Sequence, residues 1–481
     1  MQNRRSFLKT AAASSALAVP PLVWLERGSG RTNRAALPAN GADPWSEVPG
    51  ILSRIVPPGF ADREFNILRF GAHGDDATDC TEAFRKAIAE CHAAGGGRII
   101  VPKGKFLTGA IRLRSGVNLH LDEGATIAFS RDPQKYPLVF TRWEGIELRN
   151  YSPFVYAFEE ENVAITGAGT IDGQADSEHW WSWKGRRERG APGEPNQAKD
   201  RKLLQEMGEK NVPVEQRVFG DGHYLRPQFI QPYRCKNVLF EGVTLRNSPM
   251  WQVNPVLCSN VTVRKLNIDS SGPNTDGCDP ESCTDVLIED CVFNTGDDCI
   301  AIKSGRNTDG RRLHAPSENI VIRRCHMKDG HGGVTLGSEI SGGVRNVFVE
   351  NCQMDSPHLE DALRIKNNAM RGGVLESVYA RGIRVGQVAM AGLAIDFHYE
   401  EGEAGGFTPV VRNVEIEDMS VQETKYPLYL RGFKNTPIEG VRLTNCAFEH
   451  AAEPSLLENV KHLRLQDVRV NGKTWKAPAS A

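Results

Sequence analysis

Acidic and basic side chains gather in four loops near the middle of the chain. The loops contain the stretches NTDG, GDDCIAIKSG, GHGGVTLGS and RIK, and their polar side chains include Asn274, Asp276, Asp297, Asp298, His331, Arg364 and Lys366. Carboxyl groups crowded within a few ångströms cannot all ionise easily, so at least one should keep a proton near neutral pH. Such a cluster sets an acid beside a base, which is the pair of groups that glycosidic cleavage requires.

Two cations follow these acids in the sequence. Arg364 and Lys366 alternate with Ile365, so in a strand both would point to the same side and could clamp a substrate carboxylate. Each loop also has an ordinary interpretation when taken alone. An aspartate pair after glycine is most often a turn, as is a histidine between glycines, and Lys on a strand edge often prevents unwanted pairing. The catalytic interpretation therefore needs an element that brings the four loops together.

A weak repeat from residue 235 onward predicts that element. CKNVLFEGVTL, CSNVTVRKLNI and CTDVLIEDCVF are the first of nine units. Each unit begins at an apolar origin, and the origins are Val238, Val261, Val286, Ile320, Val347, Val378, Val414, Val441 and Leu463. Positions 2, 5 and 7 residues after every origin are also apolar. A spacing of 2, 3 and 2 indicates two short strands of period two that are joined by a corner.

The repeat is typical of a solenoid. Its origins are 22 to 36 residues apart, so a constant strand part is followed by a loop of variable length. Units rich in Val and Ile and without helix caps argue against a helical-repeat array. The sequence therefore predicts an all-β parallel β-helix with coils about 4.8 Å apart. Asp297 and His331 each lie 11 residues after their own origin, so we expect one directly above the other.

The part of the chain before the repeats predicts a cap, the first coils and an insertion. Phe84, Ile88 and Cys91 share one face of a short helix that Gly95–Gly97 ends, and this helix would cover the apolar end of the solenoid. The stretches GRIIVPKGKFLTGAIRLRSGVNLHLDEGATIAFS and ENVAITGAGTIDG are the expected first coils. A polar insertion at about residues 174–229 is the expected lid or cleft wall. Its tryptophans could stack on sugar rings or form a packed plug, and they are Trp180, Trp181 and Trp183.

The N-terminus predicts export. Residues 1–25 contain Arg4-Arg5 followed by SFLK and an apolar stretch, a pattern that is typical of a bacterial twin-arginine signal peptide. Pro20-Pro21 interrupt the stretch, which is too short for the roughly 20 residues of a membrane-spanning helix. The alternative is a disordered basic N-terminus. Residues 26–62 are expected to be a linker, and residues 63–475 the catalytic domain of a periplasmic or extracellular protein.

The cysteines predict neither a disulfide framework nor a zinc site. They number eleven, which is odd, and form no CxxC pair. Several cysteines recur at equivalent places in the units, so we expect most of them to be small buried side chains stacked in two ladders. The first ladder contains Cys235, Cys258 and Cys283, and the second contains Cys291, Cys325, Cys352 and Cys446.

Composition excludes some classes of protein. With 40% hydrophobic and 25% charged residues among 481, the chain can bury a large core and is not disordered. Its 58 Lys and Arg against 60 Asp and Glu give a net charge of -2, which lacks the positive field of a nucleic-acid binder. We expect no nucleic-acid partner and no membrane partner after signal removal, and no pattern specifies an oligomeric state.

The four motifs, in their order, resemble the signature motifs of the polygalacturonases, glycoside hydrolase family 28. The resemblance covers most of the chain from about residue 64. It implies a right-handed parallel β-helix that hydrolyses α-1,4-linked galacturonate in pectin with inversion, without metal or organic cofactor. The expected substrate is a pectic polysaccharide or an oligogalacturonide, and the same resemblance together with the insertion suggests exo-action, at a chain end.

The resemblance also implies roles for the seven polar residues. It makes Asp297 the general acid, and Asp276 and Asp298 the groups that position and activate water. His331 would sustain the protonation of these acids, and the residues left for the substrate are Asn274, Arg364 and Lys366. One tension remains, because stacked coils bring carboxylates closer than the roughly 6.5 to 9.5 Å usual for inverting enzymes.

Three alternatives remain open. A rhamnogalacturonan-directed hydrolase of the same family would share the acids. A calcium-dependent pectate lyase on the same fold would use a metal cluster and an Arg base, and it would yield an unsaturated sugar. A noncatalytic polysaccharide-binding β-helix would need no acid pair, so measurable turnover excludes it.

Overall fold

The structure is a computed structural model that describes residues 43–185 and 195–477. From Pro44 onward the chain forms one compact unit. The expected signal peptide, residues 1–25, and the first part of the expected linker lie outside the described residues. Among the residues that are described, no helix has both the length and the apolar character that a membrane crossing demands.

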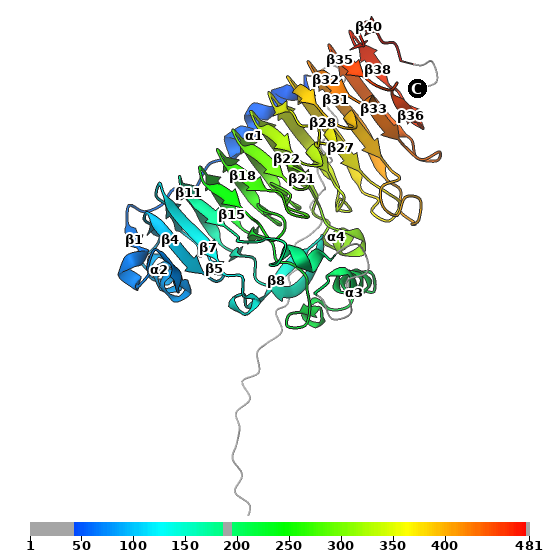
Figure 1. The fold of residues 1–481 in the computed structure, drawn as a ribbon. Coiled ribbons are helices and arrows are strands. Elements are labelled where there is room, and N and C mark those ends of the chain that lie inside the picture. Colours follow the sequence, from blue (N-terminus) through cyan, green and yellow to red (C-terminus); the bar gives the residue numbers. More distant parts are fainter. Residues whose placement is uncertain (1–42, 186–194, 478–481) are drawn as a thin grey trace, which may run out of the picture. The chain divides into compact units, whose positions relative to one another are not determined.

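Parallel strands stacked along one axis make up most of the fold, as Figure 1 shows. The first long sheet contains, in spatial order, β1 (Glu64–Asn66), β3 (Gly97–Val101), β6 (Val117–Leu121), β11 (Glu161–Gly167), β15 (Lys236–Glu241), β17 (Ser259–Arg264), β19 (Thr284–Glu289), β22 (Ser317–Arg323), β25 (Val344–Glu350), β28 (Val374–Arg381), β31 (Val410–Glu417), β34 (Ile438–Thr444) and β37 (Val460–Lys461), with β38 (Arg464–Gln466) also on β34.

The second long sheet contains β2 (Asp75–Asp79), β4 (Gly104–Thr108), β7 (Ala125–Phe129), β12 (Thr170–Asp172), β16 (Thr244–Arg246), β18 (Asn267–Ser270), β20 (Val292–Thr295), β23 (His326–Asp329), β26 (Gln353–Met354), β29 (Arg384–Gln387), β32 (Ser420–Thr424), β35 (Ala447–Ala451), β39 (Arg469–Val470) and β40 (Lys473–Thr474). The third face contains β21 (Ile300–Ile302), β24 (Gly332–Leu336), β27 (Asp361–Lys366), β30 (Ala391–Asp396), β33 (Tyr426–Arg431) and β36 (Leu456–Glu458). Isolated bridges extend this face toward the N-terminus as far as the short sheet of β5 (Ile111–Arg112), β10 (Val155–Phe158) and β14 (Ile230–Tyr233).

The register confirms the predicted parallel β-helix. Val238 lies opposite Val261, and Val261 lies opposite Val286, so successive origins stack in one column. The same register continues through the later coils, and all nine origins are buried. The period-two spacing worked because inward positions of each strand pack against the same positions of the coils above and below.

The predicted cap is present as α2 (Thr81–Ala93). The helix buries Phe84, Ile88 and Cys91 together with two alanines, and it packs against β3 and β5 at the N-terminal end of the stack. All eleven cysteines of the chain are free and buried, as the ladder interpretation expects. Cys235 and Cys258 are in contact, with a distance of 3.4 Å from the Cys235 amide nitrogen to the Cys258 Sγ atom.

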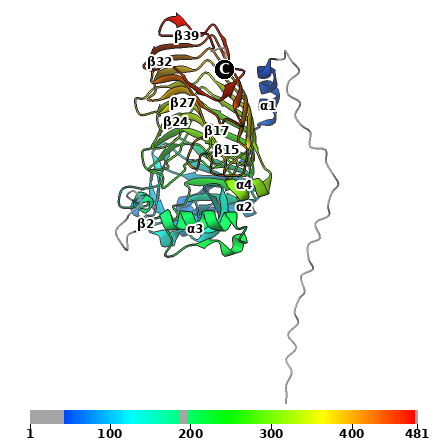
Figure 2. The same ribbon diagram turned by 90° about the vertical axis from the view of Figure 1, so that its right-hand side faces the viewer.

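Residues 44–55 of the expected linker form a packed element, which corrects that part of the prediction for residues 26–62. Residues 44–54 form the short helices η1 (Pro44–Glu47) and α1 (Val48–Arg54), and α1 lies along the outside of the stack in Figure 2. Their apolar residues pack on outward-facing side chains of the first long sheet, and this cluster contains Trp45, Val48, Ile51, Ile55, Leu287, Val321, Phe348 and Tyr379. Apolar residues spaced 3 and 4 positions apart form the buried face of this helix. Pro49 and Gly50 had suggested a linker instead.

Further short elements lie beside the stack. They are η2 (Ile67–Phe70), η3 (Pro133–Lys135), the hairpin of β8 (Leu138–Trp143) and β9 (Ile146–Tyr151), η4 (Trp181–Lys184), α3 (Ala198–Glu209), η5 (Val214–Gln216), β13 (Val218–Phe219) and α4 (Asn307–Leu313). The expected insertion thus contains η4, α3, η5 and β13, and β13 pairs with the hairpin while α3 packs against α4 and β9. Trp180 and Trp183 are buried with their ring centroids 5.0 Å apart, so these two form the packed plug.

Candidate active site

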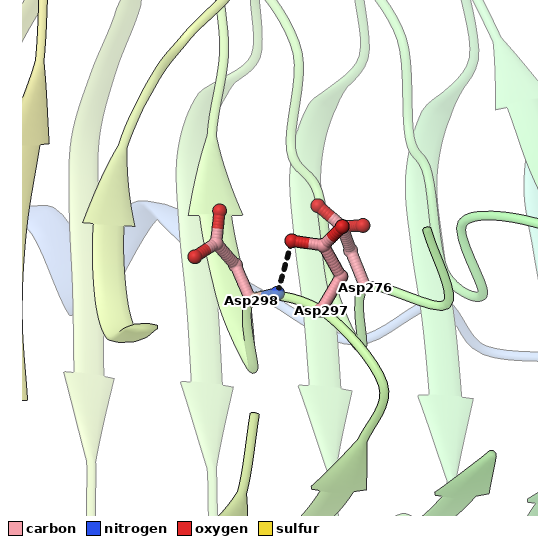
Figure 3. A group of neighbouring side chains, drawn as sticks. All are labelled: Asp276, Asp297 and Asp298. Carbon is pink, nitrogen blue, oxygen red and sulfur yellow. Dashed lines mark hydrogen bonds between the residues drawn. The ribbon is translucent and has the colours of Figure 1, made fainter. Parts of the chain in front are cut away.

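Three carboxylates from two consecutive coils form the centre of the site, as Figure 3 shows. Asp276 follows β18, while Asp297 and Asp298 follow β20 one coil later. One oxygen from each carboxylate lies within 4.8 Å of one from each of the others. The Asp298 amide donates a hydrogen bond of 3.0 Å to Asp297 Oδ1, which fixes the orientation of that carboxylate. We call these three residues the acid triad.

His331 lies directly above Asp297, as the equal offsets from their origins predicted. The His331 amide donates a hydrogen bond of 3.0 Å to the Asp297 carbonyl, and the His331 Nδ1 is 3.0 Å from Asp297 Oδ1. This side-chain hydrogen bond raises the pKa of His331, although burial opposes it. Burial raises the pKa of Asp297, but the hydrogen bond from His331 and the charge of Lys366 outweigh it, so the pKa of Asp297 falls well below its usual value.

Lys366 reaches the triad from two coils further along. Its Nζ atom is 2.6 Å from Asp298 Oδ2, and both side chains are almost fully buried. Burial lowers the pKa of Lys366, but the negative charge of Asp298 raises it above its ordinary value. The ring of Tyr399, in the loop after β30, has its centroid 5.3 Å from Nζ. We did not predict Tyr399, and its distance from every motif in the sequence left no signal for it.

Arg364 lies on the same face of β27 as Lys366 but makes different contacts. Its Nη1 atom is 2.8 Å from Glu360, and its Nε atom is 3.2 Å from Asp361. Burial raises the pKa of Asp361 to about 7, although the Arg364 charge opposes this. Arg364 is 18% exposed and Lys366 only 7%, so Arg364 is the more accessible of the two cations.

Asn274 supports the triad from the other side. Its Nδ2 atom donates a hydrogen bond of 3.2 Å to Asp297 Oδ2, and its Oδ1 accepts one of 2.8 Å from Arg226 Nη2. Arg226 is fully buried and also donates to the carbonyl of Pro273, at 2.6 Å. Burial lowers the pKa of Arg226 to about 10. We did not predict Arg226, which lies in the insertion and connects it to the triad through Asn274.

Asp276 has a different environment from the other two acids. Burial and the negative charges of Asp279 and Asp297 raise the pKa of Asp276 well above its usual value. The Lys303 Nζ atom is 3.6 Å from Asp276 Oδ2, and Lys303 is 3% exposed. Lys303 stands in the motif GDDCIAIKSG at an outward position just after β21, which is a signal that we did not use.

The whole arrangement matches a known family. Residues 217–468 match the model of glycosyl hydrolases family 28, which is more than half of the chain. The chain belongs to glycoside hydrolase family 28. An endo-polygalacturonase of Pectobacterium parmentieri is 30% identical over 395 residues, which are 77% of this chain and 85% of that protein. An exo-poly-alpha-D-galacturonosidase of Dickeya chrysanthemi is 25% identical over 386 residues, which are 73% of this chain and 62% of that protein.

A solved family 28 structure agrees with the fold in detail. The crystal structure of a hyperthermoactive exopolygalacturonase from Thermotoga maritima is 48% identical in sequence and has a TM-score of 0.86. The similarity covers 89% of this chain and 96% of that one. The parallel β-helix seen here is therefore shared with a solved structure that is 48% identical in sequence.

The family 28 site offers acid–base chemistry next to an anionic substrate. The seven residues that the sequence singled out come together, although Arg364 is held by Glu360 and Asp361 and touches no member of the triad. The triad oxygens lie close enough to share a divalent cation. Two ammonium groups already face these oxygens, from Lys303 and Lys366, and they repel a metal cation. The charges thus favour a sugar carboxylate and a shared proton over a metal.

Proposed function

We propose that this protein hydrolyses the α-1,4 bonds between galacturonate residues of pectin by acid–base catalysis. The acid triad supports this proposal, because three carboxyl groups within 4.8 Å hold a proton donor beside a proton acceptor. The neighbouring Lys366 and Arg364 supply charge for a galacturonate carboxylate. The relatives in family 28 are polygalacturonases and an exo-poly-alpha-D-galacturonosidase, which supports this substrate.

We assign the roles by position in the site. Asp297 donates its proton to the glycosidic oxygen, and Asp276 and Asp298 hold and deprotonate the attacking water. His331 shares one proton with Asp297 across their 3.0 Å contact. A bound sugar excludes water from this pair, and exclusion of water favours the neutral form, with the proton on Asp297 over the ion pair. Binding of the substrate therefore loads the acid.

Inversion follows from the direct attack of water. The triad oxygens are closer than the roughly 6.5 to 9.5 Å separation that is usual for two carboxylates of inverting enzymes. In this site a pair of carboxylates, Asp276 and Asp298, serves the water, and the Lys366 ammonium 2.6 Å from Asp298 Oδ2 makes this carboxylate a weaker nucleophile toward the sugar. This arrangement supports inversion over a covalent intermediate.

Exo-action is supported by the way the insertion is fastened to the site. Arg201 on α3 pairs with Glu144 in the turn of the β8–β9 hairpin, at 2.6 Å, and with Glu400 in the loop after β30, at 3.5 Å. Buried Arg306 pairs with the same two glutamates, at 3.6 Å and 3.3 Å. These contacts tie four segments that are far apart in the sequence, namely α3, the hairpin, the loop after β30 and the segment before α4, into one wall beside the triad. A rigid wall at the end of a cleft restricts it to chain ends.

Lys184 adds a cation to this wall. Lys184 is exposed, and the negative charges of Glu144 and Asp297 act on its ammonium, which places it in the field of the triad. Within the described residues it forms no ion pair, so the charge is available to a second galacturonate unit. The insertion therefore places a positive charge where it can attract the carboxylates of the terminal sugars.

The decisive experiment compares polygalacturonate with rhamnogalacturonan as substrates. We expect new reducing ends from polygalacturonate, no unsaturated product, full activity in the presence of a chelator, and the β-anomer as the first-formed product in proton NMR spectra. Rhamnogalacturonan should be cut much more slowly, because the Lys366 and Arg364 charges are placed for a uronate. An unsaturated product together with loss of activity in chelator would favour a lyase, and no turnover of either polymer would favour a binding protein.

The length of the first products tests whether the wall restricts the enzyme to chain ends. We expect a single short product from the first minutes of digestion, while the viscosity of the polymer solution falls slowly. Chromatography of early samples against an endo-acting family member as a control measures both. A ladder of oligomers at early times would reject chain-end attack.

We also propose that the protein acts outside the cytoplasm. Arg4-Arg5 and the apolar stretch within residues 1–25 support export through the twin-arginine route, and a pectic polymer is an extracellular substrate. The free cysteines are buried, so an oxidising compartment leaves the fold unchanged.

A further inference from the structure

A second lysine of the third face lies in the same row as Lys366. Ile302 lies opposite Leu336, and Leu336 lies opposite Ile365. The next residue of each strand continues this register, so Lys303 and Lys366 occupy equivalent positions two coils apart with a glycine between them. Lys366 faces Asp298, and Lys303 faces Asp276.

The Lys303 ammonium is enclosed by acids and one aromatic ring. Its Nζ atom is 3.6 Å from Asp276 Oδ2, 3.5 Å from Asp279 Oδ2 and 3.3 Å from Glu339 Oε2. The ring of Trp251 has its centroid 4.2 Å away and covers a further side. The Lys303 side chain is 3% exposed, so the ammonium has no room to contact a substrate.

We propose that Lys303 is a positioning residue that keeps Asp276 able to ionise and so to act on the attacking water. The inference rests on the proposed hydrolysis, and it adds a residue whose contribution passes entirely through Asp276. The two lysines of the row then have different roles. Lys366 binds the sugar carboxylate, and Lys303 stabilises the ionised form of Asp276, the carboxyl group that acts on the attacking water.

The charges around Asp276 support this assignment. Burial raises its pKa, the carboxylates of Asp279, Asp297 and Asp298 raise it further, and Lys303 is the positive charge that opposes them. Arg226 contributes a further positive charge from the side of the insertion. Without Lys303 the proton on Asp276 would be released only at a much higher pH.

The other two acids around Lys303 leave its charge available to Asp276. Burial raises the pKa of Asp279 to about 8, with Lys303 opposing the rise, so Asp279 is largely neutral at pH 7. Burial also acts to raise the pKa of Glu339, but Lys303 and then Arg306 lower it to about 2. Glu339 is thus a permanent anion with a second cation, Arg306, at 3.4 Å. Lys303 is the close positive charge of both Asp276 and Asp279, and of these two Asp276 is the one that takes part in the proposed reaction.

The test is the pH profile of the Lys303→Met variant. Asp276 must be ionised to accept a proton from water, and loss of the neighbouring cation raises the pH at which it ionises. We expect the acidic limb of the kcat profile to move upward by one pH unit or more, with about a tenfold or larger loss of kcat below pH 6. KM should change less than threefold, because Lys303 does not touch the substrate.

Matched variants separate this role from a purely structural one. Lys303→Arg keeps the positive charge, so the acidic limb of its kcat profile should lie close to that of the unmodified enzyme. Lys303→Met with Glu339→Gln removes one charge of each sign, so the thermal stability should recover while the limb stays displaced. Lys265→Met removes an exposed lysine, which is 64% exposed, and should change neither quantity. A Lys303→Met enzyme with lower stability and an unmoved acidic limb would overturn the inference.

A measurement without substrate separates this inference from the proposed hydrolysis. The infrared band of the protonated carboxyl, assigned with Asp276→Asn, should persist to higher pH in Lys303→Met than in the unmodified protein. If the band shifts but polygalacturonate is not cut, the hydrolysis proposal fails while the link between Lys303 and Asp276 stands. If the polymer is cut and neither the band nor the limb moves, Lys303 has no such role.

Discussion

Asp297→Asn should reduce kcat on polygalacturonate by at least about 10³-fold while the fold stays intact, because an amide cannot donate the proton that the leaving oxygen needs. The asparagine side chain has the same shape, and its single oxygen can still accept the hydrogen bond that Asp297 Oδ1 receives from the Asp298 amide, while the bond from Asn274 to Oδ2 is lost. Steady-state kinetics measure the loss, and circular dichroism with thermal unfolding checks the fold. Full activity in this variant would reject the role that we assign to Asp297.

A second substrate distinguishes which member of the triad is the acid. An aryl galacturonide with a good leaving group needs little protonation, so Asp297→Asn should lose much less activity on it than on the polymer. Asp276→Asn should lose activity on both substrates, because it affects the water. This comparison matters because the free site holds the proton more firmly on Asp276 than on Asp297. The opposite pattern would exchange the two roles. Asp329→Asn, outside the triad, is the matched control.

Lys366→Met should reduce kcat/KM by about 10³-fold. The change removes the cation proposed to bind the galacturonate carboxylate, and it leaves Asp298 buried without its partner at 2.6 Å. Breaking a buried pair in this way costs about 3–5 kcal/mol in the free energy of unfolding. Kinetics on oligogalacturonides and denaturant titrations measure the two effects separately.

A double variant separates binding from stability at this position. Lys366→Met with Asp298→Asn removes both charges, so the stability should return while the activity stays lost. Lys236→Met, an exposed lysine of β15, is the matched control and should change neither quantity. An unchanged KM in Lys366→Met would contradict the role of Lys366 in binding the substrate carboxylate.

The repeat made most of the fold predictable from the sequence. The origins from Val238 to Leu463 are inward residues, and a period of two within each strand requires no knowledge of contacts between distant residues. α1 escaped prediction because it packs on outward residues such as Phe348 and Tyr379, which carry no signal in a pattern that counts inward positions. Its proline and glycine also suggested a linker.

The site was predictable where it depends on position within a coil. Equal offsets placed His331 over Asp297, and alternation placed Arg364 and Lys366 on one face of β27. Tyr399 and Arg226 could not be found in this way, because each reaches the site through a long loop whose path the repeat does not determine. Their contacts depend on tertiary packing, and the sequence around them has no period.

The variable loops between constant strands have a consequence for how such an enzyme can change. Backbone hydrogen bonds between coils hold the triad and both lysines, whereas the hairpin, the insertion and the loop after β30 build only the surroundings. Loops of different length can therefore be exchanged at the ends of the strands without moving the reacting groups. Chimaeras that carry a relative's loops on these coils should inherit its preference for chain ends or chain interiors while keeping their own acids.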